Sequence, residues 1–402
     1  LDLGLTPMLM ANVVKGGVRM DISQATGGFA LASGKAVTFD ADVTSAEVKQ
    51  LALRFVQGQE TLAELAANGP FSIEKVEGQL QVRLANVDRN TLNLFAAGSG
   101  MDFARTSISS TNQIQAANGG KTFTIAGAFF VNDLQVIQTN QSTPILNFQA
   151  AYDASVDQAA SNAVVRNLTL NGVQQGKQFL KGALTAPMII NWGSASQGVG
   201  DSTFLLTVDQ FDLAAWKAFM GDSLVSGILN SKVEVTSTGS GKNAALSHNT
   251  RIENLSINAG ESRISDIQVV LSGNGKADNM ETFETKFDLE LSQAGSRALQ
   301  VAGTASFNSP SESARADIDG TASIPPLVRM AAVQDASFAS GAAEFHVAFQ
   351  QKKENQQVQG TFNLQNLTGS LGSNVFQNFA AASQFEVAMD RQKADIRKST
   401  IE

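Results

Sequence analysis

The sequence predicts a mainly β protein, a long antiparallel meander curled into an elongated, taco-like β-groove with short helical inserts. Three observations predict this fold class. Apolar and polar residues alternate over much of the chain, and short turns rich in Gly, Asn and Ser separate the alternating segments. Only 16% of the 402 residues are charged, against about 25% in a typical soluble domain, while 43% are hydrophobic.

The clearest strand is expected over 283–291, FETKFDLEL. Phe283, Phe287, Leu289 and Leu291 point to one side, and charged residues point to the other. A period of two means a strand with one dry face and one wet face. Polar turns such as SGNGKADN and NSPSES follow such segments, so we expect antiparallel hairpins. The same alternation predicts strands over 76–84, 123–131, 145–156, 345–349 and 385–389.

Four segments depart from the alternation and predict helical inserts. The first covers 44–69 and carries two Thr-x-x-Glu capping boxes, which begin at Thr44 and Thr61. The others are short apolar segments near Gly or Pro residues. These three cover 87–98, 208–221 and 324–334.

The insert over 208–221, VDQFDLAAWKAFMG, is a candidate cap for the sheet. Leu213, Trp216 and Met220 stand at i, i+3 and i+7, which places them on one face of a helix, and Asp212 is its expected N-cap. We expect this face to cover the edge or mouth of the sheet, either as core or as a lid that limits access to a groove.

A weak internal repeat links distant parts of the chain. Ser226-Gly227 recurs 114 residues later as Ser340-Gly341, and Asn254-Leu255 recurs 112 residues later as Asn366-Leu367. An Asn-Leu-Thr element also occurs at 167–169. We therefore treat 1–402 as one elongated repetitive segment of a longer protein. The proposed repeat units are 70–207, 208–321 and 322–402.

The sequence carries no set of residues that would support catalysis, so we expect no enzyme, no cofactor and no metal site. It has no cysteine, and its two histidines are His248 and His346. We expect both on the surface, His248 in a polar turn and His346 on the outward side of a strand. The net charge of −8 argues against the basic patch of a nucleic-acid-binding protein.

The apolar side of the expected strands is rich in Phe. The chain has 24 Phe but two Trp and one Tyr, Tyr152. Phe suits a dry face, where a phenolic hydroxyl would lack a hydrogen-bond partner. So few helices cannot cover so much sheet, so the face should fold on itself or bind a ligand. A lipid tail gains about 0.8 kcal/mol per buried CH₂ without any hydrogen bond. The predicted lining residues are Leu146, Phe148, Phe204, Leu206, Phe283, Phe287, Leu289, Leu291, Phe345, Val347, Phe349 and Phe385.

These features resemble the AsmA-like family, the repeating β-groove proteins of the AsmA, TamB and YhdP type. The resemblance lies in the long amphipathic strands, the Asn-Leu-Ser/Thr element and inserts such as FDLAAW at 211–216. It implies a phospholipid, or another lipid with acyl chains, carried along an apolar trough between membranes. It also implies a place in the periplasm of the cell envelope. Anchoring in the inner membrane, and contact with the outer one, would use parts of the protein outside this chain.

Two other readings remain open from the sequence. The first is a structural or adhesive surface protein, a β-solenoid or passenger-like domain without a transport role, which predicts short rungs and repeats of about 20–25 residues. The second is an enzyme or another β-sandwich protein, which would need a convergent polar site.

Overall fold

The computed structural model describes residues 2–5, 11–96, 98–138, 141–193, 201–217, 223–259, 262–331, 333–390 and 394–401. Strands dominate these residues, which confirms the mainly β, antiparallel meander with few helices. The chain divides into two compact parts, Leu1–Leu206 and Thr207–Glu402, here called unit 1 and unit 2. Within the described ranges, no helix has both the length and the apolar character of a membrane span.

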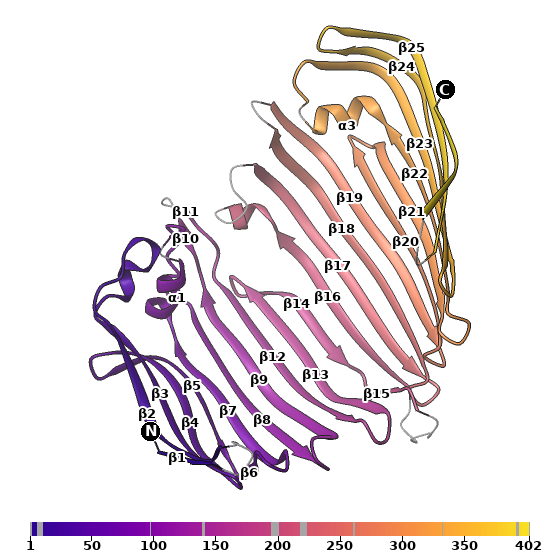
Figure 1. Cartoon of the computed structure of the whole chain (residues 1–402). Coiled ribbons are helices and arrows are strands. Elements are labelled where there is room, and N and C mark those ends of the chain that lie inside the picture. Colours follow the sequence, from indigo (N-terminus) through magenta and orange to yellow (C-terminus); the bar gives the residue numbers. More distant parts are fainter. Residues whose placement is uncertain are drawn as a thin grey trace. The chain divides into compact units, whose positions relative to one another are not determined.

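Unit 1 is an antiparallel meander in which consecutive long strands pair (Figure 1). Its edges and turns carry shorter strands, and β10 and β11 form a separate hairpin. The strands are β1 (Asp2–Leu5), β2 (Ala11–Ile22), β3 (Lys35–Thr44), β4 (Val48–Gln57), β5 (Glu60–Gly69), β6 (Phe71–Ser72), β7 (Glu77–Val87), β8 (Ser107–Ala117), β9 (Thr122–Leu134), β10 (Ile137–Gln138), β11 (Gln141–Ser142), β12 (Leu146–Asp157), β13 (Asn162–Gln174), β14 (Lys177–Leu184), β15 (Met188–Asn191) and the first part of β16 (Ser202–Asp212).

Unit 2 continues the same plan with longer strands, up to 17 residues each in β18, β19, β23 and β24. Each strand from β17 to β25 pairs with the next. Its sheet bends, so that β24 and β25 are seen nearly edge-on while β17 to β20 face the viewer (Figure 1). The strands are β17 (Leu224–Thr238), β18 (Asn243–Ala259), β19 (Ser262–Asp278), β20 (Thr282–Gln293), β21 (Ser296–Asn308), β22 (Ser313–Ser323), β23 (Ala336–Lys352), β24 (Asn355–Leu371), β25 (Asn374–Met389) and β26 (Ala394–Ile401).

The helices expected over 87–98 and 324–334 are present as α1 (Arg89–Ala96) and α3 (Ile324–Met330). In unit 1, α1 lies beside the 3₁₀ helix η1 (Gly27–Ala32) and contacts β5 and β7 (Figure 1). Asp102 anchors α1, because its carboxylate accepts hydrogen bonds from Arg89 Nε at 2.8 Å and from Asn93 Nδ2 at 2.8 Å. These bonds, with Arg89 the larger cause, hold the pKa of Asp102 well below its usual range.

The helical insert expected over 44–69 is wrong, because β4 and β5 occupy this segment. Leu51 and Leu53 face one side of β4, while the other side mixes buried Ala52 and Val56 with the charged Arg54, so the alternation of polar and apolar residues is weak. The capping-box bond does form: Glu47 N donates to Thr44 Oγ1 at 3.0 Å. It closes the turn between β3 and β4 instead of starting a helix.

The helix expected over 208–221 is also wrong in its first part. Strand β16 continues to Asp212, followed by a single 3₁₀ turn, η2 (Ala214–Trp216). The N-cap expected at Asp212 is wrong, because Leu213 is the N-cap of this turn and makes no side-chain cap bond. Asp212 Oδ1 instead accepts from Ala214 N at 2.9 Å, one residue before the N-cap. Met220 lies outside the described residues. Gln210 has a φ of 51°, and the adjacent polar residues Asp209 and Gln210 break the alternation near the end of this strand.

Two bulged joints in unit 2 occupy the positions of the internal sequence repeat. Asn254 and Asn366 both have φ of 53°, in the left-handed region where Asn is tolerated. Each interrupts the ladder at a β-bulge, and its carbonyl accepts a hydrogen bond from a serine hydroxyl, Ser226 at 2.8 Å or Ser340 at 2.6 Å. The Asn-Leu element is thus a bulge signal at these two places. The three repeat boundaries stay a prediction.

Candidate functional site: the apolar face

In unit 2 the side chains that share a side of the sheet with Phe287 form one continuous surface, here called the apolar face of unit 2. Strand pairing places these residues directly opposite one another across the sheet. One row, read from β18 to β25, consists of His248, Gly273, Phe287, Gly303, Ile318, Val347, Gly360 and Phe385. The next consists of Thr250, Leu271, Leu289, Val301, Gly320, Phe345, Phe362 and Ser383.

This face is exposed to an unusual degree. Phe283, Phe307 and Phe362 are 41%, 45% and 42% exposed, and Phe385 is 38% exposed. No phenylalanine whose burial the structure describes is buried, although Phe is among the residues most often buried in globular proteins. The chain exposes 22724 Å², whereas two compact domains of half its mass would expose about 18,000 Å² together.

Glycines lie opposite aromatic rings on this face and leave room for the rings. A Cβ on Gly303 would lie 2.6 Å from Phe287 Cε1, and one on Gly320 or Gly360 would collide with the ring of Phe345 or Phe385. Each ring therefore lies across the neighbouring glycine, an arrangement that shields the glycine backbone and flattens the ring against the sheet. Strand pairing puts every one of these glycines directly opposite its ring.

An open hollow of about 560 Å³ lies within the apolar face of unit 2. Small residues form its middle, among them Gly275, Ala305 and Ala316, and larger apolar side chains surround them. Phe283 and Phe307 stand at one side with ring centroids 6.3 Å apart. The hollow offers apolar contact and few hydrogen-bonding groups, which suits a hydrocarbon chain better than a polar metabolite.

Unit 1 has an apolar face of its own, defined as the side that carries Phe39 and Phe129. One row of directly opposed residues, from β3 to β13, consists of Phe39, Leu53, Leu65, Leu84, Ser110, Phe129, Ala150 and Leu170. On this face Leu53 and Leu65 are each 47% exposed.

Tyr152 finds a hydrogen-bond partner on the apolar face of unit 1. Tyr152, Gly127 and Asn112 are directly opposed on three adjacent strands. The ring crosses the glycine, so that the phenolic hydroxyl donates to Asn112 Oδ1. Asn112 Nδ2 then donates to Ser110 Oγ at 2.8 Å, and Ser110 Oγ donates to the Ala128 carbonyl at 3.0 Å. The chain's one tyrosine is thus satisfied by a short polar network.

The expected position of His248 is wrong. It lies within β18 on the apolar face, not in a polar turn, and its ring is 3.0 Å from the place of a Cβ on Gly273. Ser247 and Asn249 flank it on the polar side, so three polar residues in a row hid the register from sequence reasoning. His346 does face the polar side, where Nδ1 is 2.8 Å from Asp319 Oδ1.

The twelve predicted lining residues fall into two groups. Those from Phe283 onward lie together on the apolar face of unit 2. Phe148 lies on the apolar face of unit 1, and Phe204 and Leu206 lie there against Gly182. Leu146 is on the same side of its strand as Phe148 but is buried. Their role as lipid contacts stays a prediction.

Of the predicted capping residues, Leu213 lies against the sheet of unit 2. Its Cδ1 is 3.1 Å from the place of a Cβ on Gly227, beside Leu255, and its N–H donates to the Gly227 carbonyl at 2.9 Å. Trp216 packs on Phe211 with ring centroids 5.7 Å apart. The matching contact at the other joint is Ile324 of α3 against Gly341. Whether either insert acts as a lid stays a prediction.

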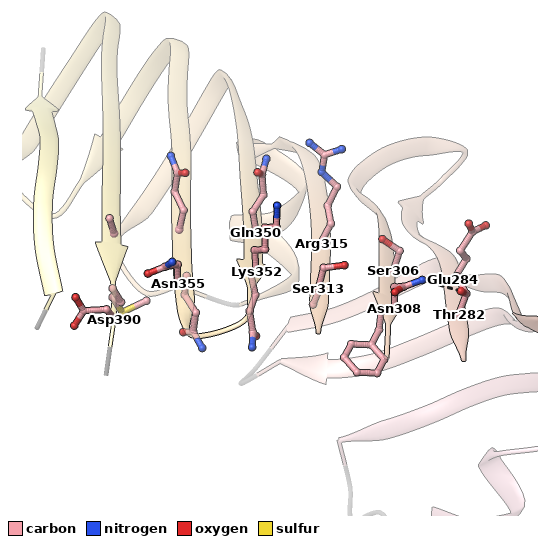
Figure 2. A pocket seen from close by; sticks show the side chains of 17 residues that line it. Thr282, Glu284, Ser306, Asn308, Ser313, Arg315, Gln350, Lys352, Asn355 and Asp390 are labelled. Atoms are coloured by element: carbon pink, nitrogen blue, oxygen red, sulfur yellow. Dashed lines mark hydrogen bonds between the residues drawn. The ribbon is translucent and has the colours of Figure 1, made fainter. Parts of the chain in front are cut away.

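The opposite side of the unit 2 sheet is polar, and it has a hollow of its own near the ends of β20 to β24 (Figure 2). Glu284, Arg315 and Gln350 point to the same side of their strands there. The charges are of mixed sign, since Glu284 lies 3.1 Å from Lys276 and Arg315 lies 3.8 Å from Asp317. Among the described residues, no three carboxylates or histidines come together as metal ligands.

Sequence reasoning missed two polar positions on the apolar face of unit 2. Ser231 Oγ and Thr250 Oγ1 are 2.8 Å apart on β17 and β18, and Thr250 follows His248 on the same side of β18. The only available signal was the strand register, which the sequence did not determine there.

No protein-family model matches this chain, and neither any curated protein nor any solved structure does.

Proposed function

We propose that the protein binds the acyl chains of lipids on its apolar faces and carries them along an apolar trough. The observation that supports this most is the exposure of a continuous Phe-rich surface, with no phenylalanine of described burial withdrawn into a core. Six side chains of unit 2, each about two-fifths exposed, offer roughly 400 Å² together, a patch of the size that marks interaction sites. They are Leu246, Leu271, Phe283, Phe307, Phe362 and Phe385.

The shape of the surface also supports an acyl-chain ligand. The hollow beside Phe283 and Phe307 is open, and its small residues leave room for a chain to lie flat. Burial of ten methylene groups there would contribute about 8 kcal/mol before the entropy cost of association. A ligand with polar groups spread along its length would lose hydration on this surface without recovering hydrogen bonds.

We further propose the cellular role that the resemblance to AsmA-like proteins implies. In this role the chain is part of a periplasmic bridge that moves phospholipid between the inner and outer membranes. Its strand-rich meander with short inserts is compatible with that family's groove. The adhesive alternative predicted solenoid rungs, whereas the strands here are antiparallel and reach 17 residues.

A pair of adjacent residues tests lipid binding. Phe362 and Thr361 lie side by side on β24 but face the apolar and polar sides respectively. Phe362→Glu should abolish binding of diphenylhexatriene and reduce phospholipid captured from dioleoylphosphatidylcholine vesicles. Thr361→Glu should leave both unchanged. Equal binding by the two variants and the wild type, or no lipid detected by native mass spectrometry with the wild type, would contradict the proposal.

A further inference from the structure

A small polar patch interrupts the apolar face of unit 2. It consists of the His248 ring and the hydroxyl pair of Ser231 and Thr250, here called the polar patch. His248 and Thr250 are two residues apart on one side of β18, about 7 Å along the strand. Ser231 is directly opposite Thr250 on β17. Apolar residues such as Val233 and Leu271 border it.

The patch has unused hydrogen-bonding capacity. His248 Nδ1 is buried and has no hydrogen-bond partner among the described residues. A buried N–H without an acceptor is more costly than a bare ring nitrogen, so the ring proton lies on Nε2 and Nδ1 stays unpaired. The proton on Nε2 makes the ring edge that lies over Gly273 a hydrogen-bond donor. The Ser231–Thr250 contact uses one of two hydroxyl hydrogens, which leaves the second free to donate.

Two donors on an apolar surface fit a ligand with acceptor oxygens. The surrounding rows of this face, from β17 to β20, carry no lysine, arginine, aspartate or glutamate. A carboxylate or phosphate placed here would lose its hydration without a counter-charge, which is far more costly than the transfer of a neutral ester. The chemistry of the patch therefore favours an uncharged carbonyl.

The polar patch also lies next to the apolar hollow, where the carbonyl end of a hydrocarbon chain would lie. Leu246 lines the apolar hollow and is two residues before His248 on the same side of β18. A hydrocarbon chain in the hollow would thus end next to the imidazole. On the other side, Leu271 and Leu289 continue the apolar surface away from the hollow.

From this we infer that the polar patch binds the ester linkages of a glycerolipid, whose acyl chains lie in the hollow and on the adjacent apolar face. His248 and the Ser231–Thr250 pair donate to the ester carbonyl oxygens. The inference rests on the proposed lipid-binding function and adds to it the part of the lipid that is recognised.

An ester and ether pair tests the inference. The full chain is offered equal amounts of dioleoylphosphatidylcholine and its dialkyl ether analogue, which has the same head group and chains but no carbonyls. Native mass spectrometry of the wild type should show a roughly tenfold preference for the ester, as expected for two hydrogen bonds. His248→Phe, which keeps a flat ring over Gly273, should lower the preference to about threefold. Thr250→Val should lower it by a similar factor, also to about threefold.

Controls separate this inference from the proposed function. Ser247→Ala, on the polar side of the same strand, should keep the full preference, and diphenylhexatriene should bind the His248, Thr250 and Ser247 variants equally. Equal binding of ester and ether by the wild type, or an unchanged preference in His248→Phe, overturns the ester site alone. Stronger binding of free oleate than of the diester through His248 would show an acid site and overturns it too. If neither lipid nor diphenylhexatriene binds, both proposals fail.

Discussion

Each unit places a polar ring on its apolar face opposite a glycine, and the two rings differ in what surrounds them. The Tyr152 ring crosses Gly127, and its hydroxyl donates to Asn112 Oδ1. Asn112 Nδ2 donates in turn to Ser110 Oγ. His248 lies over Gly273, and its Nδ1 has no hydrogen-bond partner in the part of the chain that the structure describes. The first arrangement is complete within the protein and stabilises it. The second is incomplete, and we propose that its ring serves a ligand.

The largest expected difference between the units concerns the glycines beneath the rings. A Cβ on Gly127 would meet the Thr111 carbonyl at 2.6 Å as well as Asn112, and neither can move without breaking the ladder or the network. Gly127→Ala should therefore lower the free energy of unfolding of unit 1 by about 2–3 kcal/mol. Gly320→Ala should lower that of unit 2 by about 1 kcal/mol, because the three atoms nearest to its Cβ all belong to the Phe345 ring, a side chain that can turn aside.

Urea unfolding can measure this, because Trp192 reports on unit 1 and Trp216 on unit 2. Trp192→Phe and Trp216→Phe backgrounds isolate each signal. Similar costs at Gly127 and Gly320 would mean that the Tyr152 network is as adaptable as a free ring.

Removal of the polar atoms should have opposite signs in the two units. Tyr152→Phe deletes the donor to Asn112 and should destabilise unit 1 by about 1 kcal/mol. His248→Phe removes an unpaired buried nitrogen, so unit 2 should be unchanged or up to about 1 kcal/mol more stable. The same fluorescence-detected unfolding provides the test, and a clear loss of stability in His248→Phe would indicate a structural role for the imidazole.

Ion pairs on the polar sides should also differ between the units. Glu64 lies 2.6 Å from Arg54 Nε and 3.1 Å from Arg83 Nη2, and these bonds, chiefly that to Arg54, lower its pKa from the usual 4.5. A lowered pKa gives stability that is present above pH 4.5 and disappears as the pH falls through the folded-state value. Glu64→Gln should cost unit 1 about 1 kcal/mol at pH 7, and the difference from the wild type should shrink below pH 4.5.

Glu284 in unit 2 is the matched control for Glu64. Its partner Lys276 is about half exposed, as is Glu284 itself, so solvent and salt screen the pair. Glu284→Gln should therefore leave the unfolding midpoint of unit 2 unchanged between pH 4 and 8. An effect as large as that of Glu64→Gln would show that exposure does not decide the strength of these pairs.

The smallest effects are expected at the bulged joints within unit 2. Asn366 and Asn254 adopt left-handed backbone, so Asn366→Ala and Asn254→Ala should each cost about 0.5–1 kcal/mol. The glycine variants should stay within a few tenths of a kcal/mol of the wild type. Unequal costs at the two positions, measured by urea unfolding, would show that the joints are not equivalent.

The strands with one wet and one dry side could be read from the sequence, as at Phe283–Leu291 in β20. The segments around Val48 and His248 could not, because each presents similar residues on both sides of the strand. Val48 belongs to a strand whose polar side also carries buried Ala52 and Val56, and His248 belongs to a run of polar residues. Alternation identifies a strand only where the two sides differ in polarity.

The sequence by itself determined that this chain forms a meander of long strands with a Phe-rich apolar side, because period-two alternation and turn residues act locally. The tertiary structure decided which residues meet on that side. Tyr152 and Asn112 are 40 residues apart and meet only through Gly127, and His248 joins the apolar face only through its register with Gly273. Register depends on the pairing of whole strands, so no single segment contains that information.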